Sequence, residues 1–514
     1  MTSFLPPSAI FKLTMIKHGE ETKMKKTSIG FLAVIALWIG VGSLAYGCVI
    51  SSERVGLEYP TWTEDEDATA KDGAKASQVG VANPGQWRGM GADLVKRPWT
   101  AAFKVVTLNL SLSAINRYVF KYSWANISLR TIQKNFETGP VWDNDYFMMN
   151  CIAHPFHGSM YFNFARSSGL SFWESVPLAL GGSSMWEAFM EKDPPSFNDL
   201  IFTTVGGTYL GETLFRISSR ILDNRARGLE RAGRELLGFV LNPAGGLTRL
   251  LSGQMFRYQS SPDQTNEPFE TTFVIGRSEA ATPWGILQSG GDPFLSITFR
   301  AGDPFTGEAD PRSFYFFVHR CRFQFGKKLG TTQSGYGYLA GGRFGAEDGT
   351  GHILGLFLHF DFRVTEAVRL AGPSLTGGWV SRFHLGAKAE LQTAVHLGAM
   401  LLGTCNNPYV RKAGWMERDY DFGSGPVAKG EAKLSLGKWG TFELNAAHHL
   451  LAVFKGSSGA DRATFLEASY DIPVYKSWSV GLEYVNVRRD SNYRDVPDVR
   501  TNTSDFRLIG AVGF

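Results

Sequence analysis

Two histidines, a tyrosine and an arginine lie close together in the segment from residue 151 to 169, CIAHPFHGSMYFNFARSSG. His154 and His157 could serve as general bases or as metal ligands, because a neutral imidazole accepts a proton or binds a metal near neutral pH. The other residues of the segment are mostly apolar. Its polar groups are therefore either a functional site or a packed network that satisfies its own hydrogen bonds.

A hydrolase is the first functional hypothesis. An imidazole would act as general base for a nearby serine, because a serine hydroxyl alone is a weak nucleophile, and a carboxylate would orient the imidazole. No G-x-S-x-G motif is present, so the hypothesis depends on residue types alone. The candidate catalytic residues are His154, His157, Ser183 and Glu187, with Ser184 and Asp199 as alternatives.

Two further interpretations remain open. The two histidines with Glu187 or Glu191 have the ligand types of a metal site, although the sequence contains no H-E-x-x-H motif. Alternatively, these groups form a hydrogen-bonded network inside a helical domain. We take the network as the default, and we predict no metal or other cofactor.

A second candidate site is rich in arginine. The segment from 216 to 236, RISSRILDNRARGLERAGREL, contains arginine and no lysine as its basic residues. Guanidinium groups suit phosphate, so outer-membrane lipid head groups are a candidate partner. The preferred alternative is a solvated helix with Glu230–Arg234 and Arg231–Glu235 pairs. The candidate binding residues overall are Tyr161, Arg166, Asp199, Glu212, Arg216 and Arg220.

The elements that position these residues are predicted to be helices over residues 96 to 255. The sequences at 171–174 (SFWE) and 196–199 (SFND) resemble capping boxes. Pro155 favours a helix that starts at that residue, with His154 near the N-cap. The glycines at both ends of 207–211 (GTYLG) would let another helix approach closely.

From about residue 268 the apolar period changes from 3.6 to 2. Residues 356–363 (LFLHFDFR) and 385–392 (LGAKAELQ) alternate in this way, and so do roughly a dozen segments in all. This pattern predicts a membrane β-barrel with an apolar outer face and a polar lumen. A soluble β-sandwich, the alternative, would also alternate. It would not need the last amphipathic strand, which ends on Phe514 and resembles the signal that bacterial barrel-assembly machinery recognises.

The N-terminal sequence predicts secretion. From Met24 the chain reads MKKTSIGFLAVIALWIGVGSLAYGC, with a positive start, an apolar core and a small-x-small cleavage site. We expect residues 1–47 to be an upstream extension plus signal peptide. Cys48 is a candidate for lipidation, although Leu44 lies one position too far upstream for the usual motif. Residues 48–95 are acidic and poor in large apolar residues, which predicts a disordered tail in the periplasm.

Composition excludes some classes of function. The chain has 514 residues with a formal charge of +4, and a nucleic-acid-binding domain needs a clearly basic surface, so we expect no nucleic-acid partner. The four cysteines form no C-x-x-C pair, so neither a zinc knuckle nor a redox motif is indicated.

A set of motifs between about residues 98 and 250 resembles an uncharacterised bacterial envelope family, the domain of unknown function 3943. The resemblance implies a shared helical domain, often followed by β-rich sequence, and no known activity. The motifs are 142-WDND-145, 154-HPFHG-158, Tyr161, 165-AR-166, 186-WE-187, 195-PSFNDL-200, 206-GG-207, 211-GE-212 and 242-NP-243.

Together these features predict an α+β membrane protein of the bacterial outer membrane. A helical domain at 96–255, acting as a plug or docked at the periplasmic mouth, precedes an antiparallel transmembrane β-barrel at 266–514. The expected function is to bind or transport an envelope lipid or a small solute. The alternatives are hydrolysis of a lipid or glycan ester and a purely structural role.

Overall fold

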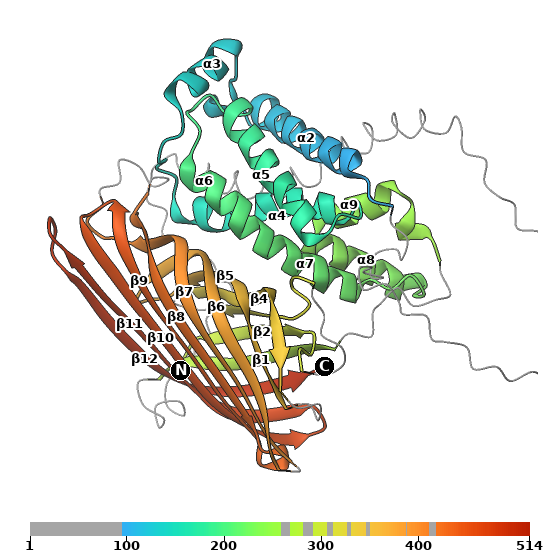
Figure 1. Ribbon diagram of the computed structural model, residues 1–514, viewed down its shortest axis with the longest axis vertical. Coiled ribbons are helices and arrows are strands. Elements are labelled where there is room, and N and C mark those ends of the chain that lie inside the picture. Colours follow the sequence, from blue (N-terminus) through green and yellow to red (C-terminus); the bar gives the residue numbers. More distant parts are fainter. Residues whose placement is uncertain are drawn as a thin grey trace, which may run out of the picture.

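The computed structural model describes residues 95–258, 268–280, 291–305, 312–325, 330–345, 350–386, 388–410 and 418–514. The predicted signal peptide, Cys48 and the tail up to residue 94 lie outside the described residues. Helices come first in the chain and a closed β-barrel follows, as Figure 1 shows.

The helical part is built from α-helices joined by short π-helical and 3-10 segments. No helix in the described ranges is both long and apolar enough to cross a membrane. The α-helices are α2 (Pro98–Ala114), α3 (Leu129–Thr138), α4 (His154–Arg166), α5 (Phe172–Phe189), α6 (Phe197–Ile201), α7 (Gly207–Ile221), α8 (Gly228–Leu241) and α9 (Pro243–Leu251). The π-helical segments are η1 (Ile115–Val119), η3 (Met149–Ala153) and η4 (Phe202–Gly206), and the 3-10 segments are η2 (Ser123–Ala125), η5 (Gln254–Phe256) and η7 (Gly437–Trp439), the last lying between two barrel strands.

Twelve antiparallel strands form the barrel, and each pairs with its neighbours in sequence. The last strand closes on the first, with Thr272 opposite Gly513 and Ile275 opposite Gly510. The strands are β1 (Phe269–Ala280), β2 (Pro293–Ala301), β3 (Phe317–Gln324), β4 (Gly330–Phe344), β5 (Gly351–Val364), β6 (Arg369–Gly386), β7 (Ala389–Asn406), β8 (Tyr420–Ser435), β9 (Thr441–Lys455), β10 (Gly459–Tyr475), β11 (Trp478–Tyr493) and β12 (Val499–Gly513).

The two faces of the barrel wall have different compositions. Arg320 on β3 forms an ion pair with Glu431 on β8, and Arg363 on β5 lies close to Glu467 on β10. These strands are not neighbours, so the side chains must meet across the lumen. Successive residues of a strand point to opposite faces. Leu356, which adjoins the inward-facing positions, is therefore on the outer face, as the alternation predicted.

The helical domain packs against the outer face of the barrel wall. Tyr209 of α7 stacks on Phe360 with ring centroids 5.9 Å apart, and Phe147 lies 5.6 Å from Phe362. Phe360 and Phe362 alternate with the inward-facing Asp361 and Arg363, so both point away from the lumen. The helices lie along the side of the barrel (Figure 1), with contacts that reach from His319 of β3 to Tyr420 of β8.

The predicted position of the helical domain is therefore wrong, because it neither plugs the lumen nor caps a mouth. Its contacts run along the wall instead. Asn150 donates to the hydroxyl of Tyr420 near the start of β8, and Arg216 of α7 donates to the carbonyl of Ser313 just before β3. The outward face of β5 is aromatic where the helices cover it, and these rings are buried there.

Two local predictions also need correction. The run at 385–392 does not form one strand, because β6 ends at Gly386 and β7 begins at Ala389. Helix α4 begins at His154, one residue before the predicted start at Pro155; its N-cap is Ala153, so His154 does lie next to the N-cap, and the helix continues directly from η3. The capping box is confirmed at Ser171, whose hydroxyl accepts from the Glu174 amide while the Glu174 carboxylate accepts from the Ser171 amide.

Candidate functional site

The histidines of the opening segment face a buried group of carboxyls. His154, the first residue of α4, has Nε2 3.4 Å from Oδ1 of Asp199 on α6, and its Nδ1 lies 3.4 Å from the Thr203 hydroxyl. Burial lowers the pKa of His154 to about 4. Burial also raises the pKa of Asp199 well above its usual range, and Asp143 adds to this effect. The imidazole is therefore neutral at neutral pH, and burial favours the protonated form of the Asp199 carboxyl.

His157 lies between aromatic rings. Its ring centroid is 4.6 Å from that of Tyr161 and 5.0 Å from that of Trp186 on α5. Burial lowers the pKa of His157 to about 3, so the imidazole is neutral. Tyr161 donates its hydroxyl hydrogen to Asn109 of α2. These contacts are those of a packed interior.

The geometry that a hydrolase needs is not present among these residues. The Ser183 hydroxyl is buried and has no hydrogen-bond partner among the described residues, so neither His154 nor His157 is paired with it. Ser184, the next residue of α5, is exposed. A carboxylate that orients a catalytic imidazole must be ionised, whereas burial raises the pKa of Asp199 and so disfavours its ionised form.

Glu187 has a structural contact instead of a catalytic one. Its Oε2 accepts from the backbone amide of Ser196 at 2.8 Å, which joins α5 to the start of α6. Burial raises the pKa of Glu187 well above its usual range. Burial also raises the pKa of Glu191 to about 7. No three His, Cys, Asp or Glu side chains in the described ranges are placed to hold a metal ion, which does not support the metal alternative.

The predicted binding residues of α4 and α7 form a buried ion-pair chain. Glu212 accepts from Nε of Arg166 and from Nε of Arg216, both at 2.8 Å. Arg220 lies 5.8 Å from the ring centre of Phe269 at the start of β1. Arg234 pairs with Glu230 at 2.8 Å, as the alternative to lipid binding predicted. The structure therefore places Arg166 and Arg216 inside the domain, where both are buried.

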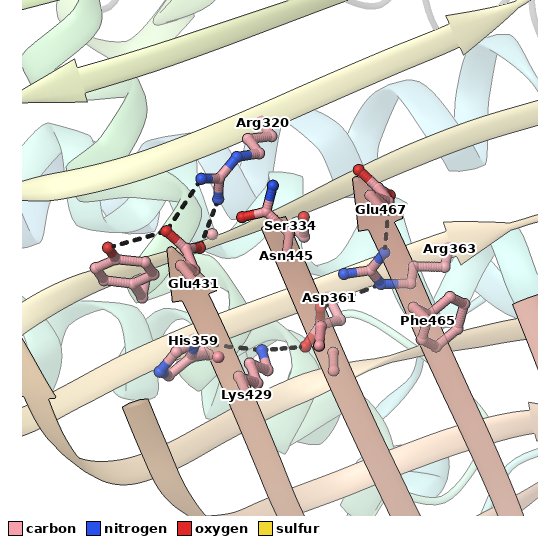
Figure 2. A pocket seen from close by; sticks show the side chains of 15 residues that line it. Arg320, Ser334, His359, Asp361, Arg363, Lys429, Glu431, Asn445, Phe465 and Glu467 are labelled. Carbon is pink, nitrogen blue, oxygen red and sulfur yellow. Dashed lines mark hydrogen bonds and ion pairs between the residues drawn. The ribbon is translucent and has the colours of Figure 1, made fainter. Parts of the chain in front are cut away.

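A second set of polar residues lies in the barrel lumen. Figure 2 shows side chains from opposite walls meeting there, with Arg320 donating to both oxygens of Glu431 at 2.7 and 3.0 Å. Lys429 donates to Asp361 at 2.6 Å, and His449 lies 3.3 Å from the same carboxylate. The charged residues that bridge the lumen are Arg300, Arg320, Arg322, Asp361, Arg363, Lys429, Glu431, Glu443, Glu467 and Glu483.

The bridges separate two cavities of the lumen. One cavity of about 560 Å³ is lined by residues such as Thr365 and Thr503, near the end of β5 and the start of β12. The other, of about 240 Å³, is lined by Thr441 and Gly513, near the opposite end. Arg322 and Glu467 line both cavities. The two side chains, 3.9 Å apart, therefore form a charged constriction between them.

The sequence prediction missed this lumen site. The alternation did assign His359, Asp361 and Arg363 to one face of a strand, which was the available signal. It could not indicate that Arg363 meets Glu467 five strands away. Such pairs depend on the number of strands and their stagger, and neither can be read from one strand.

The fold is thus a closed antiparallel β-barrel with a helical domain on its outer wall. Residues 139–244 match the model of the family described as Domain of unknown function (DUF3943), which confirms the predicted resemblance for that segment.

Among solved structures, the β-domain of the Bordetella autotransporter BrkA is 13% identical, with a TM-score of 0.22 over 48% of this chain and 99% of that chain. An outer membrane channel from Pseudomonas putida is 9% identical, with a TM-score of 0.24 over 49% of this chain and 96% of that chain. Acinetobacter baumannii OccAB2 is 8% identical, with a TM-score of 0.17 over 48% and 98%. No curated protein matches the sequence.

Proposed function

We propose that this protein is an outer-membrane β-barrel that passes small charged solutes through its lumen. The shared lining of the two cavities by Arg322 and Glu467 carries the proposal. A constriction lined by both signs of charge selects solutes by size and charge. The charged lumen also favours a small polar solute over the acyl chains of a lipid, since apolar chains would leave these charges without water.

The membrane location is supported by the outer face of the barrel. Leu397, Leu354 and Trp379 point outward and are exposed over half or more of their surface. A closed barrel satisfies its backbone hydrogen bonds without water, which is the requirement for spanning a bilayer with strands.

Charge substitutions at the constriction test the proposal. The full chain is inserted into planar bilayers, and conductance and ion selectivity are measured for Arg322→Gln and Glu467→Gln. We expect Arg322→Gln to shift selectivity toward cations and Glu467→Gln toward anions. Both variants should fold, because each leaves the neighbouring charge with an ion-pair partner. In Arg322→Gln, Glu483 still pairs with Arg507 at 3.0 Å. In Glu467→Gln, Arg322 still pairs with Glu483 at 2.6 Å.

Matched controls lie on the outer face of β11. Arg488 and Asp490 form an exposed pair there, so Arg488→Gln and Asp490→Asn should leave selectivity unchanged. If the wild-type chain inserts into the bilayer but carries no current, and no variant carries current either, the proposed transport would be contradicted.

A structural role is the second candidate, and packing in the lumen favours it. Apolar side chains, among them Leu370, Met400 and Leu451, form a cluster inside the barrel. Another cluster contains Phe316 and Phe357. Normal insertion into the bilayer without measurable conductance would support a structural role.

A further inference from the structure

The exposed face of α2 is apolar while its buried face carries the polar groups. Trp99, Phe103, Val106 and Leu110 recur at helical spacing and are exposed, Leu110 over 54% of its surface. Lys104 lies on the opposite side, 7% exposed, and donates to the hydroxyls of Ser168 and Thr248. This distribution is the reverse of that in a helix on the surface of a water-soluble protein.

Helix α8 shows the same reversal. Leu229, Leu236 and Val240 are exposed. Glu235, on the buried side, forms an ion pair with Arg249 of α9 at 2.6 Å. This second helix again directs a charged group inward and large apolar side chains outward, and its exposed Glu230–Arg234 pair lies in the first two turns.

Helix α5 contributes to the surface beside α2. Trp173 and Leu180 are exposed, while Glu187 is buried. Charged side chains lie near the ends of this pair of helices, with the exposed Lys96 bound to Glu174 at one end and the half-buried Arg117 following α2 at the other. Helix α2 is 17 residues long, or about 26 Å. The hydrocarbon layer of a bilayer is about 30 Å thick.

The position of the helices explains the reversal. Helices α4 and α7 lie next to the strands, and α2 lies on the far side of the helical domain (Figure 1). The outward side chains of the uncovered barrel wall, such as Leu397, are likewise exposed and apolar. Exposed apolar side chains therefore occur both on the barrel wall and on the outer helices. Large exposed apolar surfaces mark contact with a membrane or a partner protein.

We infer that the exposed faces of α2, α5 and α8 contact the acyl chains of the bilayer, so that the helical domain lies in the membrane beside the barrel. The inference rests on the membrane location given in the proposed function. It assigns lipid hydrocarbon as the partner because α2 and α8 direct large apolar side chains outward and a charged side chain inward. Lys104 of α2 there binds hydroxyls, and Glu235 of α8 binds Arg249. A partner protein in water would not need this arrangement.

Collision accessibility of nitroxide labels tests the inference. Single cysteines replace Val106 on α2, Leu236 on α8, Leu397 on the barrel wall and Lys134 on α3, in the full chain carrying Cys48→Ser. The protein is reconstituted in phospholipid vesicles, and the chain without an introduced cysteine gives the background from the three native cysteines. Lys134 is the matched control for water, because it is exposed on a helix whose outer side carries several charges.

We expect labels at Val106 and Leu236 to collide frequently with oxygen and rarely with a water-soluble nickel chelate. The label at Leu397 should behave in the same way. Labels that behave like the one at Lys134 would overturn the inference and leave the barrel in the membrane. Labels shielded from both reagents would also overturn it and indicate a protein partner. If the Leu397 label were itself in water, both this inference and the membrane location would be wrong.

Discussion

At the scale of single residues, the crossing of α4 and α7 depends on glycine. A Cβ atom on Gly158 would lie 1.7 Å from the Thr203 carbonyl oxygen, and one on Gly207 would lie 2.6 Å from the Gly158 Cα atom. Both obstacles are backbone atoms, which cannot move aside as a side chain can. The Gly207–Gly211 spacing in the sequence predicted a close approach, and the structure confirms it and adds Gly158 as the partner.

Gly158→Ala should therefore destabilise the helical domain by about 3 kcal/mol. Gly181→Ala on α5 is the matched control, because a Cβ atom there would meet nothing within 4 Å. It should be neutral or stabilise the domain by up to about 1 kcal/mol, since alanine favours a helix over glycine. Urea unfolding followed by circular dichroism measures both, and equal midpoints for the two variants would contradict the packing described.

The sequence identified the residues whose types could do chemistry. It could not indicate the environment in which the fold places them. The sequence placed His154, His157 and Ser183 in neighbouring segments. It did not show that the serine hydroxyl would be buried without a histidine partner, or that burial would raise the pKa of Asp199. Both facts depend on how the helices pack against one another.

At the scale of elements, the docking of helices on the barrel wall depends on a few outward aromatic side chains. Phe360 and Leu397 both point outward, but Phe360 is fully buried under the helices and Leu397 is 63% exposed. The alternation in sequence is the same for both strands. It predicts an outward apolar face without indicating whether lipid or a helix covers it, which is why the position of the helical domain was predicted wrongly.

Phe360→Ala should weaken the docking of the helical domain by about 3–5 kcal/mol, the usual loss when a buried phenylalanine is truncated. Leu397→Ala should have little effect. Protease digestion of the refolded full chain provides the measurement, with cleavage between residues 95 and 258 scored beside the heat-modifiable migration of the barrel. Equal protection of the helices in both variants would contradict the docking contact.

At the scale of the whole molecule, the barrel is closed by the pairing of its first and last strands. The fold class was predictable because alternation recurs in many segments, so an error in one, such as 385–392, did not change the result. The charge bridges inside the lumen were not predictable, because each joins strands far apart in the sequence. Closure brings these strands together, and the candidate site exists only in the assembled barrel.

At the end of β12, the stability of the barrel can be tested separately from recognition by the barrel-assembly machinery. Phe514 exchanges backbone hydrogen bonds with Thr271, at 2.9 and 3.1 Å, and its ring lies 6.0 Å from that of Phe273. Phe514→Ala keeps both backbone hydrogen bonds and removes an exposed ring.

If the barrel-assembly machinery recognises this ring, the variant should refold in detergent as well as wild type but accumulate less in the outer membrane of cells. Phe273→Ala removes the partner ring and leaves the terminal residue in place, so it should reach the membrane normally. Equal membrane levels of Phe514→Ala and wild type would show that the terminal ring is not the recognised feature, and closure of the barrel would then depend on backbone pairing alone.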